Sequence, residues 1–163
     1  MVKTPAQAPK GETLSKARLR VWLKLLKSVN GIETEIRRNL RDRHGTTLPR
    51  FDVMSALARF PDGLKMSDLS TYLKVSNGNV TGIVDKLTEE GLALRVAVPE
   101  DRRAQMARLT AKGRAAFEEL AQHHEDWINT LLDGLTARDV EALSAHLDII
   151  LDRHMDEDGR DAQ

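Results

Sequence analysis

The chain of 163 residues has no cysteine, and this absence excludes several kinds of chemistry. Without thiols the protein cannot form disulfides, use a thiolate as a nucleophile or metal ligand, or sense oxidants through cysteine. No apolar run approaches the roughly 18 residues that a membrane-spanning helix needs. The stretch MVKTPAQAPKGETLSK at residues 1–16 has basic residues but no apolar segment behind them, unlike a secretory signal. We therefore expect a cytoplasmic protein.

The net charge of the whole chain is zero, but the positive and negative residues are unevenly distributed along it. Residues 1–114 hold 22 Lys and Arg against 12 Asp and Glu, whereas residues 115–163 hold 3 against 13. So sharp a division suggests that one part faces a polyanion while the other faces away from it. Solvated acidic helices at the C-terminal end would give the same distribution, so charge alone leaves both interpretations open.

Apolar positions recur at helical spacing over most of the chain. The pattern predicts a long helix over residues 14–43, a second over 49–60, short helices over 66–74 and 77–91, and two more starting after residues 110 and 136. Thr110 and the capping-box-like TARD at 136–139 mark the starts of the last two. Between the predicted helix over 77–91 and the one that starts after residue 110, LALRVAV and QMARLT alternate as paired strands do. The predicted fold class is mainly α with one hairpin.

Two short helices joined by a tight corner at residues 75–77 and followed by a hairpin describe a winged helix-turn-helix. In that arrangement the second helix lies in the major groove of DNA and the hairpin reaches towards a minor groove. The expected hairpin tip carries Asp101, Arg102 and Arg103. We expect Arg103 to enter the minor groove, oriented by Asp101, with Arg102 on a phosphate.

The polar face of the second short helix supplies the other expected DNA contacts. Its apolar side consists of Val80, Ile83, Val84 and Leu87. The side chains expected near base edges are Ser76, Asn77, Asn79 and Thr81, with Lys86 near a phosphate. Ser76 could instead only cap the helix, and the asparagines could only serve the turn, so these alternatives stay open.

The segment DRRAQMARLTAKG at 101–113 resembles the wing signature of the MarR family of bacterial transcription regulators, Asp-x-Arg followed by Leu-Thr and Gly. The similarity extends back through VSNGNVTGIVDKLTEEGLALR and, by helix order and length, covers about residues 14–155. It implies a homodimer in which the N- and C-terminal helices interlock. We accordingly divide the chain into a flexible tail (1–13), a dimerisation region (14–48 and 111–155), a winged helix-turn-helix (49–110) and a second flexible tail (156–163).

A dimer presents two recognition helices to half-sites about one turn apart, so the expected operator is an inverted repeat of roughly 16 to 20 base pairs. The resemblance also implies repression, and a small aromatic or anionic effector that releases DNA from a cleft between the dimer helices and the winged domain. We expect an aromatic carboxylate or its CoA thioester. The expected lining residues are Arg18, Trp22, Leu26, Arg50, Met54, His123 and Trp127. The two tryptophans could instead belong to the dimer core.

The sequence offers no arrangement typical of an enzyme, and we predict no cofactor and no metal site. His123 and His124 are neighbours on one helix, about 100° apart, which is not the same-face pair that a zinc site uses. Two other functions stay open. One is an effector-independent or architectural DNA-binding protein, and the other is a winged helix that binds protein.

Overall fold

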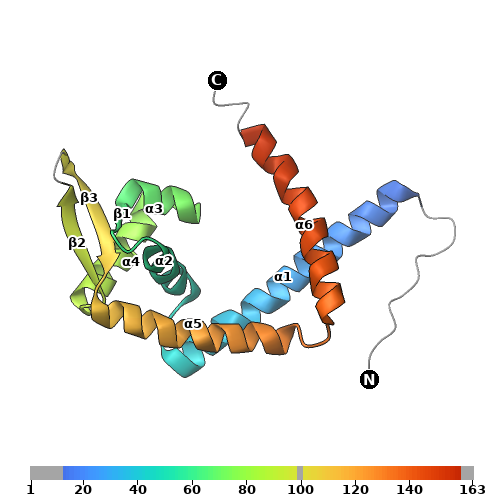
Figure 1. Ribbon diagram of the computed structural model, residues 1–163, viewed down its shortest axis with the longest axis horizontal. Helices are drawn as coiled ribbons and strands as arrows, with labels where there is room; N and C mark the ends of the chain where they lie inside the picture. The colour runs from blue at the N-terminus through green and yellow to red at the C-terminus, as the bar shows by residue number, and fades with distance from the viewer. Residues whose placement is uncertain (1–12, 99–100, 159–163) are drawn as a thin grey trace. The chain divides into compact units, whose positions relative to one another are not determined.

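The structure is a computed structural model that describes residues 13–98 and 101–158, with side chains for 13–97 and 105–152. The sequence-predicted tails therefore lie largely outside the described residues. The chain divides into two compact units, one of Pro9–Trp127 and one of Ile128–Gln163 with Met1–Ala8. Each unit is described by itself below, because the placement of one relative to the other is not defined (Figure 1).

The larger unit contains the predicted winged helix-turn-helix, which confirms the fold class (Figure 1). Its helices and strands agree with the sequence pattern to within one or two residues, apart from one added strand and an earlier start of the last strand. In order they are α1 (Leu14–His44), α2 (Leu48–Arg59), β1 (Leu64–Lys65), α3 (Met66–Leu73), α4 (Asn77–Glu89), β2 (Ala93–Val98), β3 (Asp101–Leu109) and α5 (Ala111–Leu131), whose last turn belongs to the smaller unit.

The three strands form one antiparallel sheet in the order β1-β3-β2. Strand β1 was not predicted, because Leu64 and Lys65 become a strand only by pairing with Ala107 and Met106, about forty residues further along. Strand β3 begins at Asp101, four residues earlier than the alternation in the sequence suggested. The predicted hairpin tip sequence therefore starts the strand, and Asp101 pairs with Val98 across the turn.

Local signals in the sequence explain where α4 ends and α5 begins. Gly91 has φ +71°, a left-handed conformation that favours glycine, and Leu92 N donates to Leu87 O at 2.8 Å to close α4. The hydroxyl of Thr110 accepts from Gly113 N at 2.9 Å, which confirms it as the N-terminal cap of α5. A Cβ at Gly113 would lie 1.8 Å from Leu92 O, so only glycine lets α5 start against this turn.

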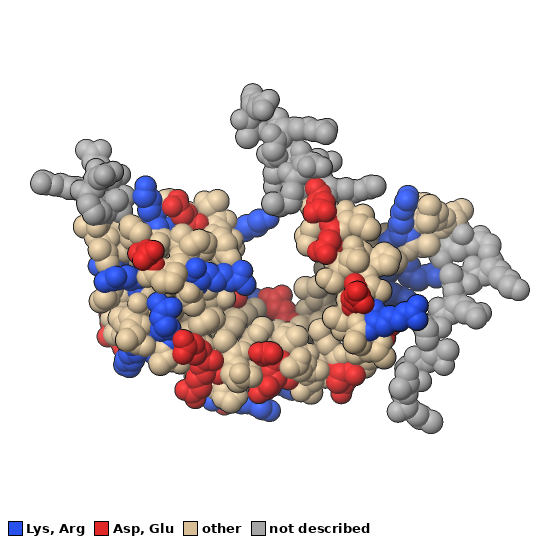
Figure 2. Space-filling model, in the orientation of Figure 1, with Lys and Arg blue, Asp and Glu red and all other residues tan. Residues whose placement is uncertain are grey.

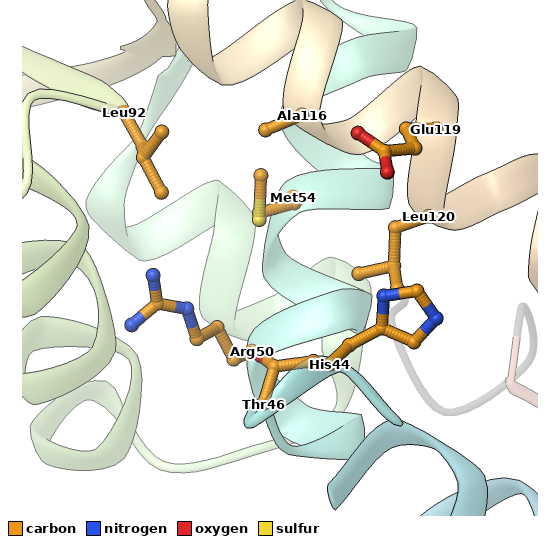
Figure 3. A pocket seen from close by; sticks show the side chains of 8 residues that line it. All are labelled: His44, Thr46, Arg50, Met54, Leu92, Ala116, Glu119 and Leu120. Atoms are coloured by element: carbon orange, nitrogen blue, oxygen red, sulfur yellow. The ribbon is translucent and has the colours of Figure 1, made fainter. Parts of the chain in front are cut away.

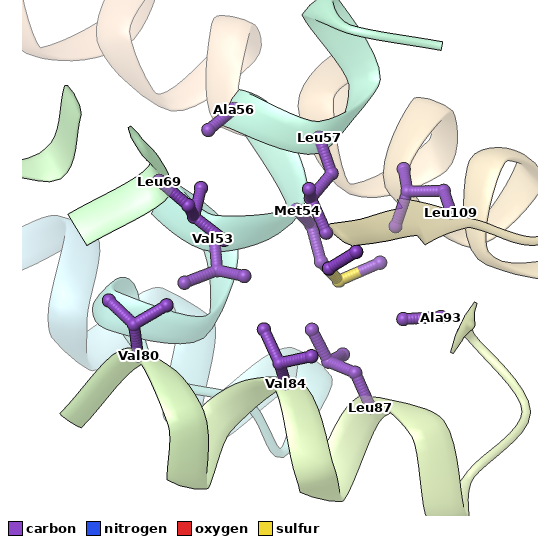
Figure 4. Packing of buried hydrophobic residues seen from close by; sticks show 11 residues of the cluster. Val53, Met54, Ala56, Leu57, Leu69, Val80, Val84, Leu87, Ala93 and Leu109 are labelled. Atoms are coloured by element: carbon purple, nitrogen blue, oxygen red, sulfur yellow. The ribbon is translucent and has the colours of Figure 1, made fainter. Parts of the chain in front are cut away.

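The core of the winged domain lies between α2, α4 and the sheet (Figure 4). Val80, Val84 and Leu87 are fully buried on α4, as the apolar side of this helix predicted. They point towards Val53 and Leu57 of α2, as Figure 4 shows. Burying side chains of this size contributes about 1.5–3 kcal/mol each. The opposite face of α4 is thereby fixed towards solvent.

Apolar side chains on α1 stay exposed over its first half, although those of its last turns are buried. Ile36 and Leu40 pack into the winged unit with 6% and 0% of their surface exposed. In contrast, Leu19, Trp22, Leu23, Leu26 and Val29 keep 42–58% of theirs. A helix with an apolar stripe that its own chain leaves uncovered needs another surface to bury it.

The smaller unit consists of the end of α5 and the helix α6 (Ala137–Asp158). Its capping box is present as predicted, since Thr136 N donates to Asp139 Oδ2 at 3.0 Å and Asp139 N donates to Thr136 Oγ1 at 3.3 Å. The apolar residues Val140, Leu143, Ile150 and Leu151 are 43–60% exposed. This helix, like the first half of α1, lacks a cover for its apolar face within the described chain.

Candidate nucleic-acid interface and effector pocket

The recognition helix α4 presents short polar side chains at its N-terminal end. Ser76, Asn77 and Asn79 are exposed, and Thr81 is half-buried. Ser76 occupies the N-cap position, yet its side chain makes no capping hydrogen bond. Capping therefore does not account for this serine. Its hydroxyl is available to donate or accept a hydrogen bond with a group outside the helix.

Further along α4, an exposed strip follows the polar start of the helix. Gly78, Gly82 and Lys86 are four residues apart and so share one face. A Cβ at either glycine would meet nothing within 4 Å, and Lys86 is exposed. Glycine inside a helix costs roughly 1 kcal/mol relative to alanine, and packing against the described residues does not explain either one. This strip is smooth enough for another molecule to approach the helix backbone.

Arg95, on β2, links the recognition helix to the wing. Its Nη2 lies 2.6 Å from Asp85 Oδ1 and 3.5 Å from the carbonyl oxygen of Thr81, both on α4. Its Nη1 donates to Gln105 Oε1 on β3 at 2.6 Å. The guanidinium thus holds α4 and both long strands of the wing in one arrangement. No local pattern in the sequence points to Arg95, because only the folded hairpin brings its partners together.

The residues expected at the wing tip begin β3. Asp101, Arg102 and Arg103 are its first three residues in the backbone. Their side chains lie outside the described residues, so the expected orientation of Arg103 by Asp101 stays a prediction. The backbone places this segment at the end of the hairpin farthest from α5, where the wing projects from the domain (Figure 1).

A pocket of about 170 Å³ lies beside the winged helix, within the larger unit. Its polar and charged groups lie on opposite sides (Figure 3), with the Arg50 guanidinium at one end and the His44 imidazole and Glu119 carboxylate at the other. Apolar side chains form much of the remaining wall. The lining residues are His44, Thr46, Arg50, Met54, Leu92, Ala116, Glu119 and Leu120. The hydroxyl oxygen of Thr46 is buried without a hydrogen-bond partner among the described residues.

Arg50 is the cationic residue of this pocket, and it is paired with the end of the recognition helix. Its Nη1 donates to Glu90 Oε1 at 2.7 Å, and its Nη2 contacts Glu90 Oε2, which makes the pair bidentate. Hydrogen bonding from Arg50 is the main reason that the pKa of the Glu90 carboxyl lies below its ordinary value. The same hydrogen bond raises the pKa of Arg50, so both groups stay charged near neutral pH.

Three histidines pack with aromatic rings between α1, α2 and α5. The ring of His44 lies 4.9 Å from that of His123 and 5.6 Å from that of Trp127. His124 stacks on Phe51, with ring centroids 4.7 Å apart. Burial lowers the pKa of His124. Trp127 is 8% exposed, so much of its surface is already covered within its own chain.

The structure brings together part of the expected effector site. Arg50 and Met54 line the pocket, while His123 and Trp127 lie next to it through their contacts with His44. Arg18, Trp22 and Leu26 lie on the exposed first half of α1 and are not among the lining residues. The pocket also includes His44, Glu119 and Leu120, which were not predicted because nothing in their local pattern indicates that α1 and α5 meet there.

Charged side chains are mixed on the surface despite the division along the sequence. On the face shown in Figure 2, basic side chains lie over the winged-helix part, at the left of the view, with acidic ones among them. None of the described helices has the length and apolar character needed to cross a membrane. Within the described side chains, no group of three or more His, Asp or Glu could hold a metal ion.

Comparisons with known proteins agree with this geometry. A sequence model described as the MarR family matches residues 44–104. The transcriptional activatory protein BadR of Rhodopseudomonas palustris is 34% identical over 83 residues, a match that spans 50% of this chain and only 47% of BadR. The crystal structure of a MarR family transcriptional regulator from Silicibacter pomeroyi is 33% identical, with a TM-score of 0.73 over 88% of this chain and 99% of that one.

The fold is also that of a regulator solved on DNA. The MarR family regulator Sco3205 of Streptomyces coelicolor, in complex with DNA, is 23% identical, with a TM-score of 0.74 over 88% of this chain and 91% of that one. The fold, with α4 followed by the hairpin of β2 and β3, is that of a winged helix-turn-helix protein. The chain belongs to the MarR family of transcriptional regulators, which are not enzymes.

Proposed function

We propose that the protein is a homodimeric transcriptional repressor that binds an inverted-repeat operator and releases it when a small aromatic carboxylate occupies the pocket. The observation that carries the proposal is the two-sided recognition helix. Its Val80, Val84 and Leu87 are fully buried, which turns Ser76, Asn77 and Asn79 outward. These side chains and Thr81 are the proposed base contacts, and Lys86 is the proposed phosphate contact.

The uncovered apolar faces of α1 and α6 support a homodimer. Each helix carries several apolar side chains that are 40% exposed or more, and neighbouring exposed apolar side chains of this kind mark an interaction surface. A second copy of the chain is the partner that the family implies. With two-fold symmetry, the two recognition helices would read the same half-site sequence in opposite directions. We place this activity in the cytoplasm, where the operator DNA is.

The pocket supports an aromatic carboxylate as the effector. A cavity of about 150 Å³ is enough to hold a benzene ring, so 170 Å³ has room for one ring and its substituents. Arg50 matches a carboxylate, and Met54 and Leu120 match the ring. A CoA thioester would place only its acyl group inside, so the volume favours the free acid.

Footprinting of the purified protein on the DNA flanking its own gene tests the proposal. At low and moderate salt we expect a protected inverted repeat, with protection reduced by an aromatic acid. Protection that no metabolite relieves would favour the effector-independent or architectural function. A folded protein that protects no DNA at low salt would favour a protein-binding winged helix.

The sign of regulation needs a separate readout, because BadR is named an activatory protein. A reporter gene behind the operator should be transcribed more strongly when the regulator is deleted, or when the effector is supplied. Weaker transcription after deletion would identify an activator.

A further inference from the structure

Arg50 stands at the point where the pocket and the recognition helix meet. Its side chain is 22% exposed and lines the pocket, while its guanidinium is bound to Glu90, the C-cap residue of α4. Arg50 is on α2, so the ion pair ties α4 to a different helix, 40 residues away in the sequence. Any group that draws the guanidinium away from Glu90 removes this tie.

Two further contacts hold the turn that follows α4. Lys112, on α5, donates to the carbonyl oxygen of Glu90 at 3.0 Å. Thr110 donates to the carbonyl oxygen of Gly91 at 2.8 Å. These two contacts hold the backbone where α4 ends, whereas the pair of Arg50 and Glu90 is formed by side chains. The side-chain pair can therefore open while the backbone turn stays closed.

Among the described residues that line the pocket, Arg50 is the only lysine or arginine, and its guanidinium is already paired with Glu90. At the other end of the pocket, the Glu119 carboxylate repels a second negative group but accepts a hydroxyl or an amine (Figure 3). A matching ligand has a carboxylate at the Arg50 end of a single ring. Its carboxylate must compete with Glu90 for the two outer nitrogens of the guanidinium.

We propose that Arg50 couples the pocket to the recognition helix: the carboxylate of a bound ring takes the Arg50 guanidinium from Glu90 and so removes the side-chain tie between α2 and α4, while the backbone turn after α4 stays closed. The inference rests on the proposed function and names its regulation. Because coupling between two ligands is reciprocal, operator DNA must weaken binding of the aromatic acid by the same factor by which the acid weakens operator binding.

The test uses the full chain with benzoate as the probe and benzamide as its uncharged counterpart. Calorimetry gives the benzoate Kd without DNA, and fluorescence anisotropy gives the operator Kd with and without benzoate. Three variants are compared, Glu90→Gln, Arg50→Met and Glu89→Gln. Glu89 is an exposed neighbour on α4 and provides the matched loss of one negative charge.

In the wild type we expect benzoate, but not benzamide, to bind and to raise the operator Kd. In Glu90→Gln we expect benzoate to bind about three- to tenfold more tightly, because its competitor is gone. The same variant should bind the operator more weakly and respond less to benzoate. Arg50→Met should lose both benzoate binding and the response, while Glu89→Gln should behave as the wild type.

Equal benzoate affinity in Glu90→Gln and Glu89→Gln would overturn the coupling. So would benzoate-induced release that persists in Arg50→Met. If the wild type binds the operator but neither binds nor responds to benzoate, this inference fails while the DNA-binding function stands. If folded wild-type protein binds no operator, the proposed function itself fails. Circular dichroism melting curves of every variant separate these outcomes from simple unfolding.

Discussion

Arg95 and Asp85 join the wing to the recognition helix, with Arg95 Nη2 2.6 Å from Asp85 Oδ1. The other outer nitrogen of the guanidinium holds Gln105, on the second long strand of the wing. The Nε of Arg95 is buried and has no hydrogen-bond partner among the described residues. Its desolvation therefore opposes folding and is offset by the other contacts of the guanidinium. The angle between helix and wing decides whether both reach their grooves together.

Replacing Arg95 with Met should therefore impair DNA binding more than folding. Both partners of the ion pair are partly exposed, so we expect a loss of about 1 kcal/mol in the free energy of unfolding. We expect operator affinity to fall about tenfold, because without Arg95 the wing is no longer held at a fixed angle to α4. Urea unfolding and anisotropy titration measure the two effects. Arg138→Met, on α6, removes the same charge outside the winged domain, and an equal effect of both substitutions would refute the role of Arg95.

Lys86 should contribute affinity without sequence preference. Its exposed side chain lies on the outward strip of α4, and a phosphate contact adds to operator and random DNA alike. In Lys86→Ala both affinities should fall, and the slope of log K against log salt should flatten by about one unit. Lys24→Ala, on α1, is the control for loss of one exposed lysine. Weaker binding to the operator alone would show that Lys86 reads a base.

Gly82 should make α4 less stable than alanine would, but should let DNA approach the helix backbone closely. A Cβ there meets nothing within 4 Å, so Gly82→Ala should raise the free energy of unfolding by about 0.5–1 kcal/mol. On DNA the added methyl group would hold the backbones apart, and operator binding should weaken severalfold. Gly31→Ala, on α1, also adds a Cβ in open space and should stabilise without affecting the operator. If Gly82→Ala binds as tightly as the wild type, the glycine strip does not face DNA.

His124 should make the fold less stable in mild acid. Burial lowers the pKa of its imidazole, so below its ordinary pKa of about 6.5 the unfolded chain takes up a proton more readily than the folded one. Stability is then full above about pH 6.5 and falls as the pH drops below it. His124→Gln should flatten this dependence of the melting temperature, and His146→Gln, on the exposed α6, should not. An unchanged dependence in His124→Gln would show that another group is responsible.

The sequence predicted the elements whose causes are local. The long helices follow from apolar spacing, and the starts of α5 and α6 follow from Thr110 and from the box formed by Thr136 and Asp139. The apolar side of α4 is confirmed by the burial of Val80 and Val84. In each case the residues that decide the structure lie within a few positions of one another.

What the sequence did not predict depends on contacts between distant segments. Strand β1 needs β3, and the pair of Arg50 and Glu90 joins residues 40 positions apart. The predicted pocket drew on the apolar stripe of α1 and so included Trp22, yet the pocket in the structure uses His44 at the far end of that helix. The stripe indicated that α1 packs against something, but not against what.

The most direct test of a dimer that reads an inverted repeat is a change in the spacing of its half-sites. Operator DNA with 5 base pairs inserted at its centre keeps both half-sites but turns one to the opposite side of the helix, since B-DNA has about 10.5 base pairs per turn. We predict a loss of affinity of more than tenfold, recovered in part when a full turn is inserted instead. Equal affinity for all three DNAs would show that each half-site is bound independently, and would contradict a dimer with two linked recognition helices.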